Sequence, residues 1–208
     1  MPVGVPKVPY KIPVPNPYPE SEDKDYDDDD DREESVDLYD RLHQTRSLFL
    51  FQELSDEIAN NILGIMAFLN IDDNTKDQFL FINSPGGGLI NGLAVYDMIQ
   101  VVLPDVHTLC VGEALSIAAL ILTGGADTKR IAFPHSHVMI HQPRSSLGEG
   151  SPDEVYMDRE YTDILRNDVE DLYVQRTRQP RSVIREDMNH RRFMTATEAK
   201  DYGIVDSL

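Results

Sequence analysis

The chain has 208 residues, which is enough for one domain with a sizeable hydrophobic core. Its formal net charge of −18 is uneven, because residues 20–34 hold eleven acids against two bases, a net of −9 and half of the total. No basic stripe accompanies these acids, so the composition excludes nucleic acid as a partner. The single cysteine, Cys110, excludes an internal disulfide framework and fits a reducing compartment.

Residues 1–35 have the composition of a leader rather than of a folded domain. Seven of the 13 prolines lie within the first twenty residues, and the acidic run follows directly. Prolines remove backbone donors and clustered like charges repel, so we expect this segment to be extended or disordered. It resembles neither a secretory signal nor a transit peptide, and no apolar run is long enough to cross a membrane. We therefore predict one domain over 36–208, with no membrane partner.

Strand and helix patterns alternate from residue 38 onward. The expected strands, which are short apolar runs, are 47–51, 79–82, 106–111, 130–133, 138–141 and 204–205. The expected helices, which have apolar residues at helical spacing or clear start signals, are 58–69, 95–102, 116–123, 152–175, 182–190 and 197–202. Ser55 is a candidate N-cap, Ser151 and Glu154 form a candidate capping box, and Gly203 is a candidate stop. Repeated βα units predict an α/β fold with a largely parallel sheet.

Ser116 is the first candidate functional residue, because it places one hydroxyl in a small-residue, apolar segment at the predicted start of a helix. A serine nucleophile needs a base to accept its proton and donors to stabilise an oxyanion. The free N–H groups and the positive dipole end of a helix favour that chemistry. The sequence here is not a G-x-S-x-G elbow, and a buried structural serine is the alternative interpretation.

The stretch NSPGGG, residues 83–88, follows a strand and predicts an abrupt glycine turn. Glycine permits close approach of a substrate backbone and φ values that other residues avoid. A phosphate cradle is disfavoured, because neither a following Lys-Ser/Thr nor G-x-G-x-x-G spacing is present. An ordinary tight turn remains the alternative.

His141 leaves an apolar strand at a loop, which suits a general base, although a histidine there can also be structural. His135, His137 and His141 are separated by even numbers of residues, so on a strand they would face the same side and could instead form a zinc site. Pro134 disfavours this alternative, because it suggests that the strand begins only after His135. We therefore predict no metal.

The chain resembles the proteolytic subunit of the Clp protease family over about residues 36–208, in collinear order. The matching stretches are FINSPGG (81–87), YDM (96–98), PDV (104–106), GxAxS (112–116), VMIHQP (138–143), FMTAxEA (193–199) and YGIVD (202–206). The first ten residues are similar to the plastid-encoded type of this subunit, which implies the chloroplast stroma. The acidic run is not part of the family pattern.

The resemblance implies a crotonase-like α/β fold of repeated ββα units with a protruding helix-strand handle. It also implies a serine peptidase in a barrel of two stacked seven-membered rings, mixed with homologous subunits in plastids. An AAA+ unfoldase would feed it polypeptides and use the ATP, so the chain itself would need no cofactor. By the same resemblance Ser116 is the nucleophile, His141 the general base, and the N–H groups of Gly87 and Ile117 the oxyanion hole. The loop from Gln142 to about Ser151 would hold an extended peptide.

The sequence departs from the family at the triad acid. The family has Asp two residues before the Phe of the terminal motif, where this chain has Arg191. A cation cannot orient the imidazole or stabilise the imidazolium, and loss of that acid lowers turnover by about 10⁴-fold in a well-studied serine protease. Asp187 could replace the missing acid, Ser116 and His141 could act as a weak dyad, or the subunit could be an inactive ring wall. An acyl-CoA enzyme of the same fold is a further alternative, but it would leave Ser116 and His141 unexplained.

Overall fold

The computed structural model describes residues 7–11, 33–143 and 151–208, and the chain divides into two compact units, Met1–Arg46 and Ser47–Leu208. In the first unit, β1 (Lys7–Lys11) pairs antiparallel with β2 (Glu33–Asp37), and α1 (Leu38–Gln44) follows. The rest of the predicted leader lies outside the described residues. The hairpin and α1 were not predicted, and the boundary after residue 35 stays a prediction.

The second unit is built on one mixed sheet. Its strands are β3 (Ser47–Leu50), β4 (Gln78–Ser84), β5 (Val106–Leu115), β6 (Arg130–Ala132), β7 (His137–Ile140) and β8 (Arg192–Thr195). The strand order is β3-β4-β5-β7-β8, and β6 pairs with the first half of β5. Every pair is parallel except β7 with β8, so the predicted α/β fold is confirmed.

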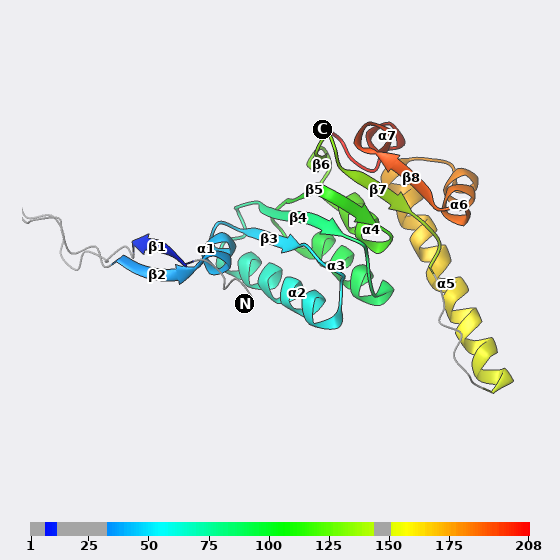
Figure 1. The fold of residues 1–208 in the computed structure, drawn as a ribbon. Helices are drawn as coiled ribbons and strands as arrows, with labels where there is room; N and C mark the ends of the chain where they lie inside the picture. Colours follow the sequence, from blue (N-terminus) through cyan, green and yellow to red (C-terminus); the bar gives the residue numbers. More distant parts are fainter. Residues whose placement is uncertain (1–6, 12–32, 144–150) are drawn as a thin grey trace, which may run out of the picture. The chain divides into compact units, whose positions relative to one another are not determined.

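Six helices accompany the described part of this sheet (Figure 1). They are α2 (Asp56–Asp72), α3 (Leu89–Val101), α4 (Ile117–Thr123), α5 (Pro152–Thr177), α6 (Arg181–Asn189) and α7 (Ala196–Tyr202). The predicted start signals are confirmed, because Ser55 accepts a hydrogen bond from the Ile58 N–H and Ser151 forms a capping box with Glu154. Gly203 ends α7 at φ 95°, a left-handed value that suits glycine.

The core lies between the sheet and the helices, and α4 is its most enclosed element. All seven residues of α4 are buried, which explains its sequence of small and aliphatic residues. Buried side chains of α2 and α3, such as Met66 and Val95, pack into the same core as Leu80 and Ile82 of β4. A fully enclosed α4 fixes the residue just before it, Ser116, relative to the sheet.

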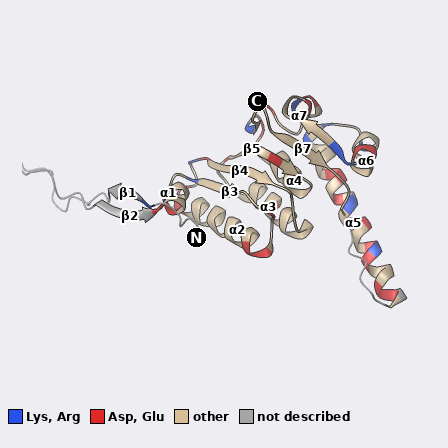
Figure 2. Cartoon of the chain, in the orientation of Figure 1, with Lys and Arg blue, Asp and Glu red and all other residues tan. Residues whose placement is uncertain are grey.

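Helix α5 projects from the sheet of this unit, as expected for the helical part of the protruding helix-strand handle (Figure 1). Charged residues of both signs run along it (Figure 2). It also exposes four large apolar or aromatic side chains in its first half: Tyr156, Met157, Tyr161 and Ile164. No helix among the described residues is long and apolar enough to span a membrane.

Two predictions about strands need correction. The expected final strand at 204–205 is wrong, because the described chain there makes only one isolated bridge, from Ser207 to Ile131. Ile204 and Val205 are apolar because they are buried, not because they belong to a ladder. Strand β8 was not predicted, since its four residues are mostly exposed and too short to show periodicity. Strand β5 also continues to Leu115, beyond its predicted end at 111.

Candidate active site

Ser116 lies at the junction between β5 and α4 with an unusual backbone conformation, φ 60° and ψ −124°. This region is costly for a residue with a side chain, and such strain persists only where the surroundings enforce it. The Ser116 N–H donates to the Met139 carbonyl of β7 at 2.8 Å, and the buried α4 holds the other side. The sharp turn presents the hydroxyl to a pocket rather than to the core.

The glycine turn is held against the chain after β3. The Leu54 N–H donates to the Gly86 carbonyl at 2.7 Å, and the Gly88 N–H donates to the Leu54 carbonyl at 3.1 Å. Gly87, at φ 148°, has no room for a side chain, because a Cβ would lie 2.3 Å from the Leu54 carbonyl oxygen. The two residues flanking Gly87 are therefore bonded to Leu54, and within the described part of the chain the Gly87 N–H has no partner.

The first N–H group of α4 is a second free donor near Ser116. Ile117 is the first residue of the helix, and its N–H makes no hydrogen bond to any residue that the structure describes. Gly87 and Ile117 line the same pocket as Ser116. Two unpaired amides beside a hydroxyl can stabilise negative charge that develops on a nearby oxygen.

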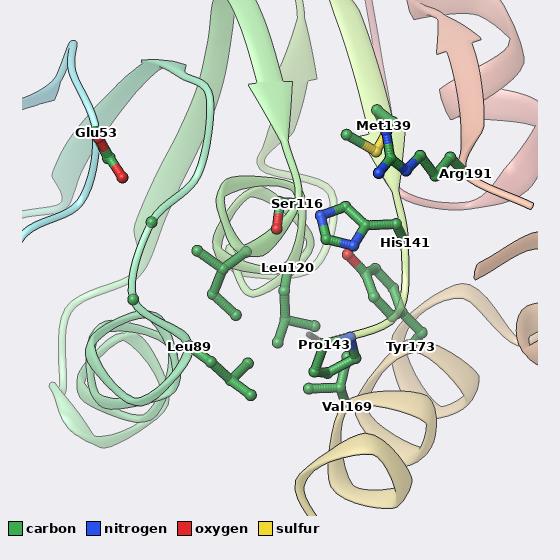
Figure 3. Close-up of a pocket in the computed structure, with 13 residues that line it drawn as sticks. Glu53, Leu89, Ser116, Leu120, Met139, His141, Pro143, Val169, Tyr173 and Arg191 are labelled. Atoms are coloured by element: carbon green, nitrogen blue, oxygen red, sulfur yellow. The ribbon is translucent and has the colours of Figure 1, made fainter. Parts of the chain in front are cut away.

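His141 follows directly after β7, and Figure 3 shows its imidazole beside the Ser116 hydroxyl. Its Nδ1 lies 2.6 Å from the Gln142 carbonyl oxygen. A carbonyl only accepts, so this contact assigns the proton to Nδ1 and leaves Nε2 free to accept one. Of the three histidines weighed as zinc ligands, only His137 lies within β7; His135 precedes the strand and His141 follows it.

The pocket that joins these groups has a volume of about 480 Å³. Its floor in Figure 3 is apolar and includes Leu89, Leu120, Pro143 and Val169. Tyr173 also lines the pocket and is buried, and burial raises the pKa of its phenol, which therefore stays protonated. The pocket offers an apolar compartment next to a serine and a histidine.

Comparison with known proteins identifies the family. The Clp protease family model matches residues 30–208. The chain is 50% identical to the ATP-dependent Clp protease proteolytic subunit of Marchantia polymorpha, covering 99% of this chain and 94% of that protein. The proteins of the same name from Staurastrum punctulatum and Nicotiana tabacum are 48% and 50% identical, covering 95% and 97% of their lengths. The chain belongs to the Clp protease family.

This family consists of serine-type peptidases, and the relatives named above come from plants and algae, which fits the predicted plastid. In this Clp protease chain, all five residues singled out for the site line one pocket: Gly87, Ser116, Ile117, His141 and Arg191. Sequence reasoning missed Leu54, which positions the glycine turn, and Tyr173 in the pocket wall. Neither carries a local motif that could have indicated its place.

Arg191 occupies the position where the Clp protease resemblance leads us to expect an acid. Ile140 of β7 pairs with Arg192 of β8 in an antiparallel register. The next two residues beyond this pair are His141 and Arg191, which therefore lie opposite each other. Arg191 has φ 53°, a left-handed value that Asp adopts more readily than Arg. The geometry thus places a cation next to His141.

Asp187, the candidate replacement acid, is engaged elsewhere. Its carboxylate accepts from the Arg192 guanidinium at 2.9 and 3.0 Å and from the Tyr202 hydroxyl at 2.8 Å. The Arg192 guanidinium also lies over the Tyr202 ring, 5.0 Å from its centroid, which closes this cluster. In the described structure Asp187 is therefore not the partner of His141.

Cys110 has no catalytic character. It is fully buried in β5, and burial raises the pKa of its thiol to about 11. A protonated thiol is a weak nucleophile, so Cys110 serves as a core side chain.

Proposed function

We propose that this chain is a serine endopeptidase subunit that cleaves unfolded polypeptides. The observation that carries the proposal is the position of the Ser116 hydroxyl beside the His141 imidazole, in a pocket that also holds two amides without a partner among the described residues. The family membership of the chain supports the same chemistry.

In the proposed reaction, Ser116 Oγ attacks the scissile carbonyl carbon while Nε2 of His141 accepts the hydroxyl proton. The carbonyl π electrons move to oxygen, and the N–H groups of Gly87 and Ile117 stabilise that oxyanion. His141 then gives its proton to the leaving amine as the C–N bond breaks. Water repeats the sequence on the acyl-enzyme, and Ser116 is restored.

The Gln142 carbonyl supplies part of what the missing acid would supply. Its contact with Nδ1 selects the neutral tautomer that accepts a proton at Nε2. It carries no full negative charge, so it stabilises the imidazolium less than a carboxylate would. We therefore propose a slow peptidase, and the alternative is an inactive structural subunit of the ring.

The substrate preference follows from the pocket floor. Leu89, Leu120 and Val169 present aliphatic side chains next to Ser116. An apolar or aromatic residue before the scissile bond would bury its side chain there, at about 25 cal/mol per Å² of apolar surface. A single apolar contact of this kind fits a peptidase of low side-chain selectivity.

Assembly with homologous subunits into two stacked rings is part of the proposal. The apolar and aromatic side chains exposed on α5 support it, because a projecting helix with several such side chains is suited to contact a partner. We propose that an AAA+ Clp ATPase delivers polypeptides, using the ATP, and that the complex works in the plastid stroma. The Ser116 and His141 chemistry requires no cofactor in this chain.

A fluorophosphonate probe tests the proposal, because it reacts with an activated serine. Labelling of the assembled chain should fall on Ser116 and should disappear in Ser116→Ala. It should fall strongly in His141→Ala, which removes the base. An assembled wild-type chain that takes no label would contradict the endopeptidase and leave the structural subunit as the better account.

A further inference from the structure

Arg191 is a cation in the wall of the candidate active site. The neighbouring cation Arg192 is neutralised by Asp187, whereas Arg191 has no hydrogen bond or ion pair with any residue that the structure describes. Its side chain is exposed and lines the pocket together with Ser116 and His141. Among the described residues this guanidinium has no anionic partner, so it is suited to bind an anion that a substrate brings.

The pocket also separates its two charges. Glu53, on the segment after β3, lies across the pocket from Arg191, as Figure 3 shows, and no ion pair joins the two. The pocket therefore has a negative side at Glu53 and a positive side at Arg191. A peptide bound across the pocket would lie between these two charges.

A guanidinium binds a carboxylate with two parallel N–H···O bonds, and this geometry is more selective than a point charge. We propose that Arg191 is a specificity-determining residue that binds an acidic side chain of the polypeptide substrate. This inference rests on the proposed peptidase function and names a substrate class for it.

We expect the acidic residue of the substrate to lie on the C-terminal side of the scissile bond, in the segment that leaves with the amine. His141 must give its proton to the leaving amine, so the leaving segment passes beside the imidazole. Arg191 is next to His141 in the register of β7 and β8 and lines the same pocket, so we expect its guanidinium to face that segment. A carboxylate bound there also places a negative charge near His141, on the side where the family has its acid.

Matched peptides test this inference in the assembled full-length chain. The peptides differ only by Asp or Asn at one of the first three positions after the scissile bond, and kcat/KM is measured for each pair. At one of these positions the Asp peptide should be cleaved about three- to ten-fold more efficiently, as expected for one charge-assisted contact. Arg191→Gln should bring that ratio to about one.

Arg178→Gln is the matched control, because it removes the same charge from an exposed residue that does not line this pocket. This control should keep the full Asp/Asn ratio. A ratio near one in the wild type at all three positions would overturn the inference, and so would a ratio that survives Arg191→Gln.

A binding measurement separates this inference from the proposed function. In Ser116→Ala, which cannot cleave, the dissociation constants of fluorescent Asp and Asn peptides should differ by a similar factor, and Arg191→Gln should remove the difference. Equal dissociation constants would overturn the role of Arg191 even if Ser116 reacts with a fluorophosphonate. Loss of Ser116 labelling would instead contradict the peptidase and leave the binding comparison valid.

Discussion

Ser116 combines backbone strain with the chemistry proposed for it. Its φ of 60° and ψ of −124° are poorly tolerated by residues with a Cβ, yet α4 and the hydrogen bond to Met139 hold it there. Strain of this kind is typical of functional sites, where the surrounding structure compensates for it. At this scale the sequence indicates which residue could react, and the backbone shows how it is presented.

Replacement of Ser116 should separate stability from activity. Ser116→Gly removes the Cβ that makes the conformation costly, so we expect it to raise the free energy of unfolding by about 1 kcal/mol. Ser116→Ala keeps the Cβ and should give no such gain. Both variants should lose peptide hydrolysis. Chemical unfolding and a peptide assay check this, and equal stability of the two variants would argue against strain at Ser116.

Arg191→Asp should restore the charge that His141 lacks. The carboxylate would lie next to the imidazole and stabilise the imidazolium, and Asp also tolerates the left-handed backbone at this position. We expect kcat/KM for an apolar peptide to rise by about 100-fold or more. Arg191→Asn has a similar shape without the charge and should give a much smaller gain. If the Asp variant is no faster than the wild type, the missing acid does not limit turnover.

Among the elements, the contact between the glycine turn and the chain after β3 decides where the candidate oxyanion donor lies. The two hydrogen bonds between Leu54 and the residues on either side of Gly87 make the turn an extension of the sheet. This arrangement needs a backbone without a side chain at Gly87. A loop can therefore position an amide as firmly as a strand would.

Gly87→Ala should break this arrangement. Its Cβ would lie 2.3 Å from the Leu54 carbonyl oxygen, so the turn must move and carry its free N–H with it. We expect at least about a tenfold loss of kcat and a loss of about 1–3 kcal/mol in the free energy of unfolding.

Gly64→Ala is the control for Gly87→Ala. Gly64 lies within α2, where a Cβ would meet no atom within 4 Å, and alanine favours the helix. The free energy of unfolding of this variant should rise by about 0.5–1 kcal/mol, and its peptidase activity should be unchanged. Unfolding and peptide assays on both variants check the pair, and a fully active Gly87→Ala would contradict the proposed oxyanion donor.

At the scale of the second unit, one ion pair joins β6 to the chain end. Arg130 donates from Nε and Nη2 to the Asp206 carboxylate at 2.9 and 2.6 Å, and its side chain is only 8% exposed. Burial raises the pKa of Asp206, but hydrogen bonds from the Arg130 side chain and backbone lower it more, and the net pKa is below its usual value. Residues 76 positions apart are thus held together by a charge-dependent contact.

The Arg130–Asp206 ion pair predicts that the free energy of unfolding depends on pH. Because the folded pKa of Asp206 lies below its unfolded value of about 4, the stabilisation is complete above that pH and is lost as the pH falls through the folded pKa. Asp206→Asn should lower the free energy of unfolding by about 2–3 kcal/mol at pH 7, since it leaves Arg130 without its counter-charge. Unfolding from pH 7 to 3 should show the gap between wild type and variant shrinking. If the difference in free energy of unfolding between wild type and variant stays constant with pH, the destabilisation comes from lost packing rather than from the lost charge.

Most of the helices and strands after residue 46, and the candidate site residues, could be predicted from local sequence patterns. Capping boxes, the GG turn and apolar runs act over a few residues, so Ser55, Ser151 and Gly203 show their roles locally. The family motifs around Ser116 and His141 are also short, at five and six consecutive residues (112–116 and 138–143). These signals are contained in the chain before it folds.

How these segments meet depends on the folded structure. It paired β8 with β7, which places Arg191 next to His141. It directed Asp187 to Arg192 and Tyr202, and it set Leu54 against the glycine turn. The sequence could not give these results, because each depends on contacts between residues far apart in the chain, which form only when the core brings their elements together.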